Sequence, residues 1–263
     1  MELDGVPATP TELAALALVN YGHFTTMRVE GGRVRGLELH LERLARDCRT
    51  VFDTDLDTDR VRTLARRVAG PADQPVILRV TVFDPALEIG WPGAEGRPKI
   101  LVTRRPARPG SPPPVRLRSV RFGRELPTVK HTGLFGAAAQ RRSAQRAGYD
   151  DALFVDPVSS MVSEGPAWNI AFVEGDRVIW PAAKCLPGVT TRLLTETLDR
   201  LGIPAGTAPV PREALPGGYA AFVTNAVVGL RPVASVDGAA LAEASPLIDA
   251  LRAGYAAIAG QPL

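Results

Sequence analysis

Lysine is scarce in this 263-residue chain. Lys99, Lys130 and Lys184 are the only lysines, so 28 of its 31 basic Lys and Arg residues are arginines. A guanidinium stays protonated and cannot act as an amine nucleophile, whereas a lysine in an apolar site can lose its proton and form a Schiff base. Each lysine is therefore a candidate for amine chemistry. Lys130 differs from the other two lysines because its neighbours in "LPTVKHTGLFGAAAQ" are largely apolar.

Cysteines are equally few, and long apolar runs are missing. Cys48 and Cys185 are too few for a disulfide framework, and neither has a partner at the spacing of metal ligands, so we expect two buried thiols and no metal. No run approaches the roughly 20 apolar residues of a membrane span. The opening "MELDGVPATP" lacks the basic and apolar regions of a signal peptide. We expect a cytoplasmic protein with no membrane partner.

Aromatic residues make up only 6% of the chain, although the net charge of +3 and the pI near 9.1 would suit a nucleic-acid binder. The basic residues are spread along amphipathic segments such as "HLERLARDCR" and are interleaved with acids. Few aromatics are left to stack on bases. This pattern favours a solvated arginine-rich surface over nucleic-acid binding.

With 45% hydrophobic and 22% charged residues, the chain reads as a globular protein long enough for one large or two modest domains. The segment "TRRPARPGSPPPVRL" is dense in proline and has no apolar period. We therefore predict an α/β protein with a smaller N-terminal α+β domain over residues 1–105, a linker over 106–117 and a larger C-terminal domain over 118–263.

Periodicity predicts the elements inside these domains. A hairpin turns at 30–32, and one helix covers 37–52 because Leu37, Leu41, Leu44 and Cys48 recur at spacings of four, three and four. A second helix ends at Gly70, and a buried strand covers 75–84. Beyond the linker we expect a helix over 133–149, a strand over 151–156, strands within 169–180 with a turn at 174–176, and a helix over 190–202. The predicted inward stripe of that last helix is Leu193, Leu194, Thr197, Leu198 and Leu201.

Three features besides Lys130 provide groups that can bind a small molecule together with its amine. Glu164 ends a short extended segment, where a carboxylate can accept a hydrogen bond from a protonated ring nitrogen. Pro187-Gly188 leads into a helix whose first free amides, at Val189 and Thr190, form an anion site. Arg43 can add a charge-assisted contact to the same anion. Each feature alone also has an ordinary structural explanation, but together they are the parts that pyridoxal phosphate requires.

Four motifs resemble the class IV aminotransferases, the fold type IV pyridoxal-phosphate enzymes that include branched-chain and D-amino-acid aminotransferases and aminodeoxychorismate lyases. "GHFTTMRVEGGRV" with "HLERL" resembles the family's opening, "VKHT" its Schiff-base lysine motif, "VSEGPAWNIAF" its glutamate-to-asparagine signature, and "LPGVTTR" its phosphate turn. The resemblance covers roughly residues 20 to 235.

The resemblance implies a role for each matching residue. Lys130 would be the catalytic Schiff-base lysine, and Glu164 would contact the ring nitrogen with Asn169 as its structural partner. The implied phosphate ligands are Arg43, Val189, Thr190, Asn225 and Ala226. The family fold is two α/β domains with pyridoxal 5'-phosphate between them, usually as a homodimer.

The motifs indicate the cofactor more clearly than they indicate the reaction. Thr191 intervenes before Arg192 where aminotransferases usually place arginine at once, and Asn225-Ala226 in "FVTNAVVGLRPV" resembles the lyases more. Against that, residues 80–98 lack the arginine loop that grips substrate carboxylate in the lyases. Weak substrate-binding candidates are Thr25, Thr26, Arg28, Arg79 and His131, and the hydroxyl of Thr25 or Thr26 would assist a leaving group in a lyase.

We therefore expect an aminotransferase that moves an amino group from a small amine or amino acid to a 2-oxo acid. The first alternative is a β-eliminating lyase of the aminodeoxychorismate type, which would release pyruvate. A third possibility is a cofactor-free binding protein on the same fold.

Overall fold

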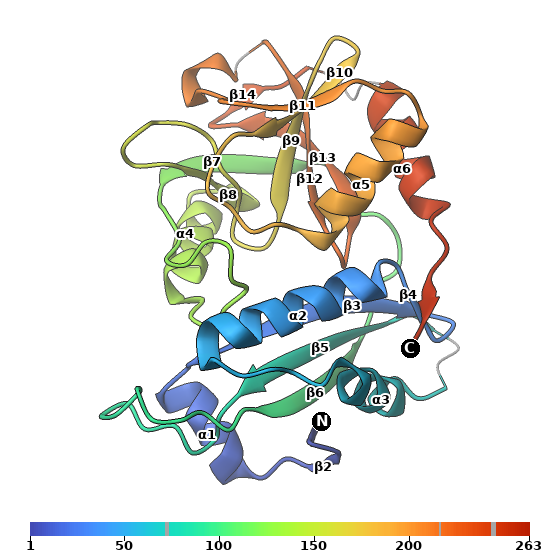
Figure 1. Ribbon diagram of the computed structural model, residues 1–263. Coiled ribbons are helices and arrows are strands. Elements are labelled where there is room, and N and C mark those ends of the chain that lie inside the picture. Colours follow the sequence, from blue (N-terminus) through green and yellow to red (C-terminus); the bar gives the residue numbers. More distant parts are fainter. Residues whose placement is uncertain (72–73, 216, 243–245) are drawn as a thin grey trace. The chain divides into compact units, whose positions relative to one another are not determined.

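The computed structural model describes residues 1–263 except 72–73, 216 and 243–245. The chain forms two compact units (Figure 1). Unit 1 contains Met1–Pro109, Val129–Gly133 and Ala259–Leu263, and unit 2 contains Gly110–Thr128 and Leu134–Ile258. Both units combine helices and sheets, as the α/β prediction requires.

Unit 1 is built on an antiparallel sheet with the strand order β15-β4-β3-β5-β6-β1-β2. Its centre is the long pairing of β3 with β5 and of β5 with β6, which continues from Val76 to Phe83 along β5. The strands are β1 (Glu2–Leu3), β2 (Val6–Pro7), β3 (Gly22–Glu30), β4 (Arg33–Val34), β5 (Val76–Phe83), β6 (Lys99–Pro106) and β15 (Gln261–Pro262). The predicted hairpin and buried strand are confirmed as β3–β4 and β5.

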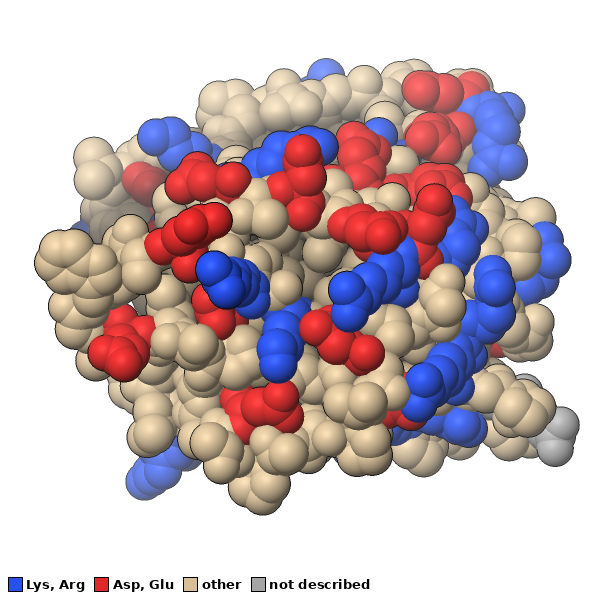
Figure 2. Space-filling view, turned by 60° about the horizontal axis from the view of Figure 1, so that its bottom comes forward, with Lys and Arg blue, Asp and Glu red and all other residues tan. Residues whose placement is uncertain are grey.

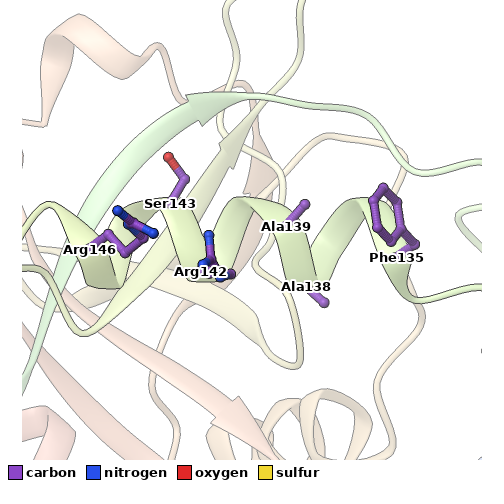
Figure 3. Close-up of a pocket in the computed structure, with 6 residues that line it drawn as sticks. All are labelled: Phe135, Ala138, Ala139, Arg142, Ser143 and Arg146. Carbon is purple, nitrogen blue, oxygen red and sulfur yellow. The ribbon is translucent and has the colours of Figure 1, made fainter.

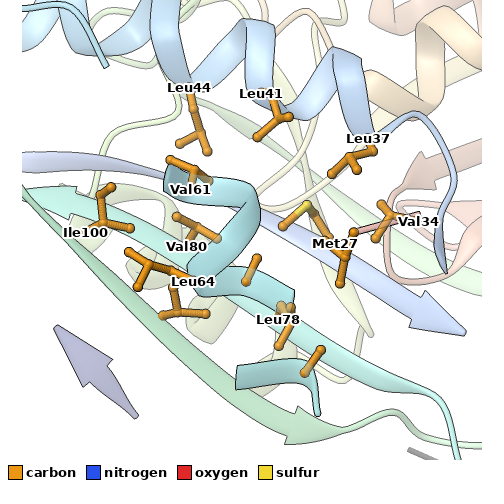
Figure 4. Close-up of a cluster of buried hydrophobic side chains, with 14 of the residues drawn as sticks. Met27, Val34, Leu37, Leu41, Leu44, Val61, Leu64, Leu78, Val80 and Ile100 are labelled. Atoms are coloured by element: carbon orange, nitrogen blue, oxygen red, sulfur yellow. The ribbon is translucent and has the colours of Figure 1, made fainter. Parts of the chain in front are cut away.

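Two amphipathic helices, α2 (Leu37–Phe52) and α3 (Thr58–Ala69), cover one face of this sheet, and α1 (Pro10–Leu18) precedes β3. The predicted stripe of α2 is buried against the sheet (Figure 4). The Asp57 side chain accepts a hydrogen bond from the Arg60 amide at the start of α3. Gly70 ends that helix at a φ of 58°, a backbone conformation that favours glycine.

A short piece of chain from beyond the proline-rich segment returns to unit 1. Residues 129–133 run antiparallel to the start of β3, where the Phe24 amide donates to the Lys130 carbonyl at 2.8 Å and the Thr132 amide donates to the Gly22 carbonyl at 2.8 Å. Lys130 is thereby attached to the sheet of unit 1, although it follows the proline-rich segment in sequence.

Unit 2 contains a mixed sheet with the order β11-β10-β9-β12-β13-β7-β8, and β14 pairs with β13. Its strands are β7 (Val115–Arg121), β8 (Asp151–Val155), β9 (Asn169–Glu174), β10 (Arg177–Pro181), β11 (Ala205–Ala208), β12 (Ala220–Asn225), β13 (Gly229–Val236) and β14 (Ala239–Ala240). Three strand pairs of this sheet, β7–β8, β13–β7 and β10–β11, are parallel.

The helices of unit 2 are α4 (Phe135–Arg146), α5 (Val189–Arg200) and α6 (Pro246–Ala256), and a 3-10 turn, η1, covers Arg212–Ala214. Helix α5 contacts β12 and α6, and four of the five residues of its predicted stripe are buried. Leu201 is the exception, because it lies beyond the last turn of α5 with 47% of its surface exposed. The prediction of an inward Leu201 is therefore wrong.

The remaining sequence expectations concern the connection and the surface. Residues 107–114, between β6 and β7, lie outside helices and strands. Cys48 is buried, whereas Cys185 is only half-buried, so the expectation of two buried thiols holds for one. Figure 2 shows Lys and Arg side chains interleaved with Asp and Glu over the face in view. Among the described residues, no helix is long and apolar enough to cross a membrane.

Candidate active site

Lys130 lies at the edge of the unit 1 sheet with both backbone polar groups engaged. Its amide donates to Asp47 Oδ2 at 3.0 Å, and its carbonyl accepts from Phe24. The Lys130 Nζ lies 5.0 Å from the centroid of the Phe24 ring. An ammonium at an aromatic ring is attracted by the ring quadrupole, so the Phe24 ring helps to define the position of the amine.

Arg43 lies on the sheet-facing side of α2 with only 7% of its surface exposed. Its Nη2 donates to Thr25 Oγ1 at 2.7 Å, and its Nε has no hydrogen-bond partner among the described residues. Burial lowers the pKa of Arg43 to about 10, while the nearby Asp47 carboxylate acts in the opposite direction. Arg43 is thus a buried cation whose direct partner is a neutral hydroxyl.

Arg79 lies on β5 opposite Thr26 of β3 and is partly buried. Its guanidinium carbon lies 3.7 Å from the centroid of the Phe24 ring, the ring that Lys130 also contacts, and its Nε donates to Thr81 Oγ1 at 3.2 Å. Burial lowers the pKa of Arg79. The structure therefore brings an amine and a guanidinium to one aromatic ring.

The other substrate candidates of unit 1 are placed differently. Arg28 pairs with Glu30 at 2.7 Å, so its charge already has an acid beside it. Thr25 is fully buried, and its hydroxyl lies 2.7 Å from both Arg43 Nη2 and His40 Nδ1. Thr26 lies on β3 in register with Arg79 and is partly exposed. His131 pairs with His23 in an isolated bridge at the sheet edge.

In unit 2, Glu164 is 4% exposed, and each of its carboxylate oxygens accepts hydrogen bonds. Arg124 Nε donates to Oε1 at 2.7 Å, and the Asn169 side chain and the Leu186 amide each donate to Oε2 at 3.3 Å. Arg124 Nη2 also donates to the carbonyls of Gly165 and Pro166, at 2.9 and 2.7 Å. This set fixes the Glu164 carboxylate in a single orientation.

Asn169 connects Glu164 to the first turn of α5. Its Nδ2 donates to the Leu186 carbonyl at 2.9 Å, and its Oδ1 accepts from Thr191 Oγ1 at 3.2 Å. A Cβ on Gly188 would lie 2.2 Å from Asn169 Oδ1, so only glycine allows this close approach. Gly188 also has no side chain to cap the first amides of α5.

The remaining residues of the predicted phosphate turn lie in unit 2. Val189 and Thr190 open α5 and are buried, and Thr190 Oγ1 has no hydrogen-bond partner among the described residues. Asn225 ends β12, and its side-chain oxygen accepts from the amides of Val227 and Val228 at 2.9 and 3.0 Å. Ala226 follows it in the turn before β13.

Two hollows lie within unit 2. One, of about 260 Å³, has Arg124, Glu164, Lys184, Asp156 and Phe154 among its lining residues. The other follows one face of α4 from Phe135 to Arg146 (Figure 3). Within the described part of the chain, no group of three His, Cys, Asp or Glu residues is placed to hold a metal ion.

Two site residues escaped the sequence analysis. His40 and Asp47 recur with Arg43 at spacings of three and four along α2, which places them on one flank of the helix, so a search for polar residues at helical spacing would have found them. Arg124 gave no such signal. It lies 40 residues from Glu164 in an irregular segment, and only the folded unit brings the two together.

Comparison with known proteins identifies the family and the fold. The model of the family described as amino-transferase class IV matches residues 22–236. A search of curated protein sequences gave no significant match.

Solved structures resemble the chain over nearly its whole length. A branched-chain amino acid aminotransferase from Escherichia coli matches with a TM-score of 0.85 at 19% identity, covering 96% of this chain and 89% of that one. A branched-chain aminotransferase from Thermoproteus uzoniensis matches at 0.83 and 21%, covering 96% and 92%. A protein assigned as 4-amino-4-deoxychorismate lyase, from Legionella pneumophila, matches at 0.78 and 22%, covering 90% and 91%.

These likenesses define the fold as that of fold type IV pyridoxal-phosphate enzymes. Because the family model covers well over half of the sequence, the chain belongs to the class IV aminotransferase family.

Proposed function

We propose that the protein is a pyridoxal-phosphate-dependent aminotransferase that transfers an amino group from a small amine or amino acid to a 2-oxo acid. The observation that carries this proposal is the arrangement at Phe24, where the Lys130 amine and the Arg79 guanidinium lie at one aromatic ring. An amine for covalent chemistry beside a cation for a carboxylate suits an amino-acid substrate.

The residues present fit the cofactor. Its phosphate requires cations and free donors, and Arg43 in unit 1 is a buried cation with an unpartnered Nε among the described atoms. In unit 2, Thr190 has an unpartnered buried hydroxyl, and the uncapped start of α5 adds amides and the positive end of a helix dipole. Asn225 and Ala226 are the further phosphate candidates.

Each residue then has a defined task. When bound, pyridoxal phosphate supplies an electron sink for the charge left at the substrate Cα. Lys130 would hold the cofactor, and its amine, once the substrate amine has taken its place, would accept the proton from the substrate Cα and return it during transfer. Glu164 keeps the ring nitrogen protonated, because its carboxylate is held in place by Arg124 and Asn169.

The deciding experiment identifies the lysine and the half-reaction. The purified protein with pyridoxal phosphate should show a violet absorbance band, and borohydride reduction with peptide mapping should place the label on Lys130. Lys130→Ala should lose the band and almost all turnover, whereas Lys99→Arg should change little, because Lys99 pairs with Glu12 at 3.2 Å. A label on Lys99 or Lys184 would refute the assignment.

Amino donor alone should bleach the band, and a 2-oxo acid should restore it. A lyase of the aminodeoxychorismate type is the second candidate, because "FTTMRV", "KH" and Asn225-Ala226 resemble the lyases. Release of pyruvate and 4-aminobenzoate from aminodeoxychorismate, without bleaching by any donor, would decide for the lyase.

We also propose that the protein acts as a homodimer, as the family resemblance implies. The hollow along α4 provides a candidate contact face, because Phe135 at its end has 86% of its surface exposed.

A further inference from the structure

Two buried polar side chains, His40 and Thr25, lie next to Arg43 in unit 1. His40 and Arg43 are three residues apart on α2, and Thr25 lies on β3 beneath them. Their exposed fractions are 1% for His40, 7% for Arg43 and 0% for Thr25. Buried polar groups of this kind are costly unless they are hydrogen-bonded, so the direction of each bond is informative.

One arrangement of donors and acceptors gives the Thr25 hydroxyl proton an acceptor. A guanidinium only donates, so Thr25 Oγ1 accepts from Arg43 Nη2 at 2.7 Å. The single hydroxyl proton of Thr25 is then donated to His40 Nδ1, also at 2.7 Å. In that arrangement His40 is neutral, with its proton on Nε2. A proton on Nδ1 would instead make the Thr25 hydroxyl accept twice, and neither of these two contacts would then take its own proton. Burial first, and then the charges of Arg43 and Lys130, lower the pKa of His40 well below its usual value, which agrees with a neutral ring.

The nearby Asp47 carboxylate does not take the place of Thr25 as the hydrogen-bond partner of Arg43. Asp47 is buried one turn further along α2, but its Oδ1 accepts from Arg46 and its Oδ2 accepts from the Lys130 amide. Arg43 is left with a hydroxyl as its direct partner and with an unpartnered Nε among the described residues. Its position is fixed while most of its charge stays available for an anion.

We propose that His40 and Thr25 are positioning residues that aim the Arg43 guanidinium at a phosphate group without neutralising it. This inference rests on the proposed function, because it takes the phosphate of pyridoxal phosphate as the anion. An aspartate in the place of Thr25 would orient Arg43 equally well, but it would neutralise the cation that the phosphate needs.

The test is cofactor affinity in matched variants, measured by titrating the apoprotein with pyridoxal phosphate. Thr25→Val keeps the side-chain shape and removes the hydroxyl, and Thr25→Ser retains it. His40→Leu removes the acceptor, and His40→Asn places an amide oxygen near the position of Nδ1. We expect Thr25→Val and His40→Leu to raise the Kd about tenfold, and Thr25→Ser and His40→Asn to stay within about threefold of wild type.

A double-mutant cycle separates positioning from general damage to the fold. In an Arg43→Ala background, Thr25→Val should change the Kd little, because the residue that it orients is gone. At saturating cofactor, the violet band of Thr25→Val should return close to that of wild type. Titration with inorganic phosphate should show the same ranking of variants.

The outcomes distinguish the two proposals. If wild type binds no pyridoxal phosphate, the proposed function fails. If wild type binds it, Arg43→Ala weakens binding, and Thr25→Val with His40→Leu bind like wild type, the positioning role alone is overturned. An equal loss of affinity from Thr25→Val with and without Arg43 would also overturn it. Should His40→Leu not fold, the Thr25→Val and Thr25→Ser pair decides.

Discussion

Buried charges of this protein are oriented mainly by hydrogen bonds from neighbouring side chains and backbone. Arg124 and Glu164 show this most directly, since their side chains are 14% and 5% exposed and are 2.7 Å apart. Two backbone carbonyls complete the partners of the guanidinium. Such a pair contributes little net stability, but removing one partner leaves the other as an uncompensated buried charge.

Replacing Arg124 by leucine should therefore destabilise unit 2 by about 3–5 kcal/mol. Adding Glu164→Gln in the same chain should recover a large part of this loss, because the neutral amide no longer needs a cation. Urea unfolding of wild type, Arg124→Leu, Glu164→Gln and the double variant measures both effects. Equal stability of the double variant and Arg124→Leu would show that the carboxylate charge is not what Arg124 compensates.

Arg79 is the residue on which the substrate proposal depends, and it has no ion-pair partner among the described residues. Arg79→Ala should raise KM for a carboxylate-bearing donor roughly tenfold to a hundredfold through loss of about 1.5–3 kcal/mol. An amine donor without a carboxylate should be affected much less. Arg28→Ala is the matched control on β3, because Arg28 already pairs with Glu30. Equal KM changes for both donors would contradict the role of Arg79.

At the scale of elements, α4 differs from α2 and α5 in how little of it is buried. Only Ala137 and Ala144 of α4 are buried, whereas another side presents small residues, two arginines and an exposed Phe135. Exposed aromatic surface beside small side chains suits a second helix or another copy of the chain.

Phe135→Glu should therefore shift the protein from dimer towards monomer, because the new charge would have to be desolvated at the contact. Light scattering over a range of concentrations measures the mass. Val158→Glu serves as the control, since Val158 is 93% exposed elsewhere in unit 2. A dimer that persists unchanged in Phe135→Glu would remove this face of α4 from the interface.

For the molecule as a whole, pH acts through the buried histidines. Burial lowers the pKa of His23 from 6.5 to about 4, with the Asp47 charge opposing the shift. The unfolded chain therefore binds a proton between pH 6.5 and 4 that the folded chain does not. The resulting contribution is fully present above pH 6.5 and is lost as the pH falls towards 4.

This difference corresponds to roughly 3 kcal/mol of unfolding free energy lost between pH 7 and pH 4. His23→Phe should lose correspondingly less stability over the same range. Comparing the pH dependence of wild type and variant by urea unfolding cancels the carboxylates common to both. Parallel curves for the two proteins would show that His23 does not titrate in this window.

Local patterns in the sequence determined much of this protein. The stripe of α2, the start of β10 after its turn and the end of α3 at Gly70 follow from side-chain period and glycine conformation, which act over a few residues. The scarcity of lysine singled out Lys130, and motif spacing singled out Glu164. The prediction for Leu201 was wrong because a helical stripe does not indicate at which residue the helix ends, and Leu201 follows the last turn of α5.

Only the tertiary structure decided which groups meet. It attached Lys130 to β3 beyond a proline-rich segment, placed Arg124 against Glu164, and enclosed the Thr25 hydroxyl between Arg43 and His40. These contacts join residues that lie 15 to 106 positions apart in the sequence. No short-range pattern predicts them, because they depend on strand pairing and helix packing. The amino-acid sequence by itself determined which reactive groups the protein has. Burial and hydrogen-bond geometry decided which neighbouring side chains position those groups.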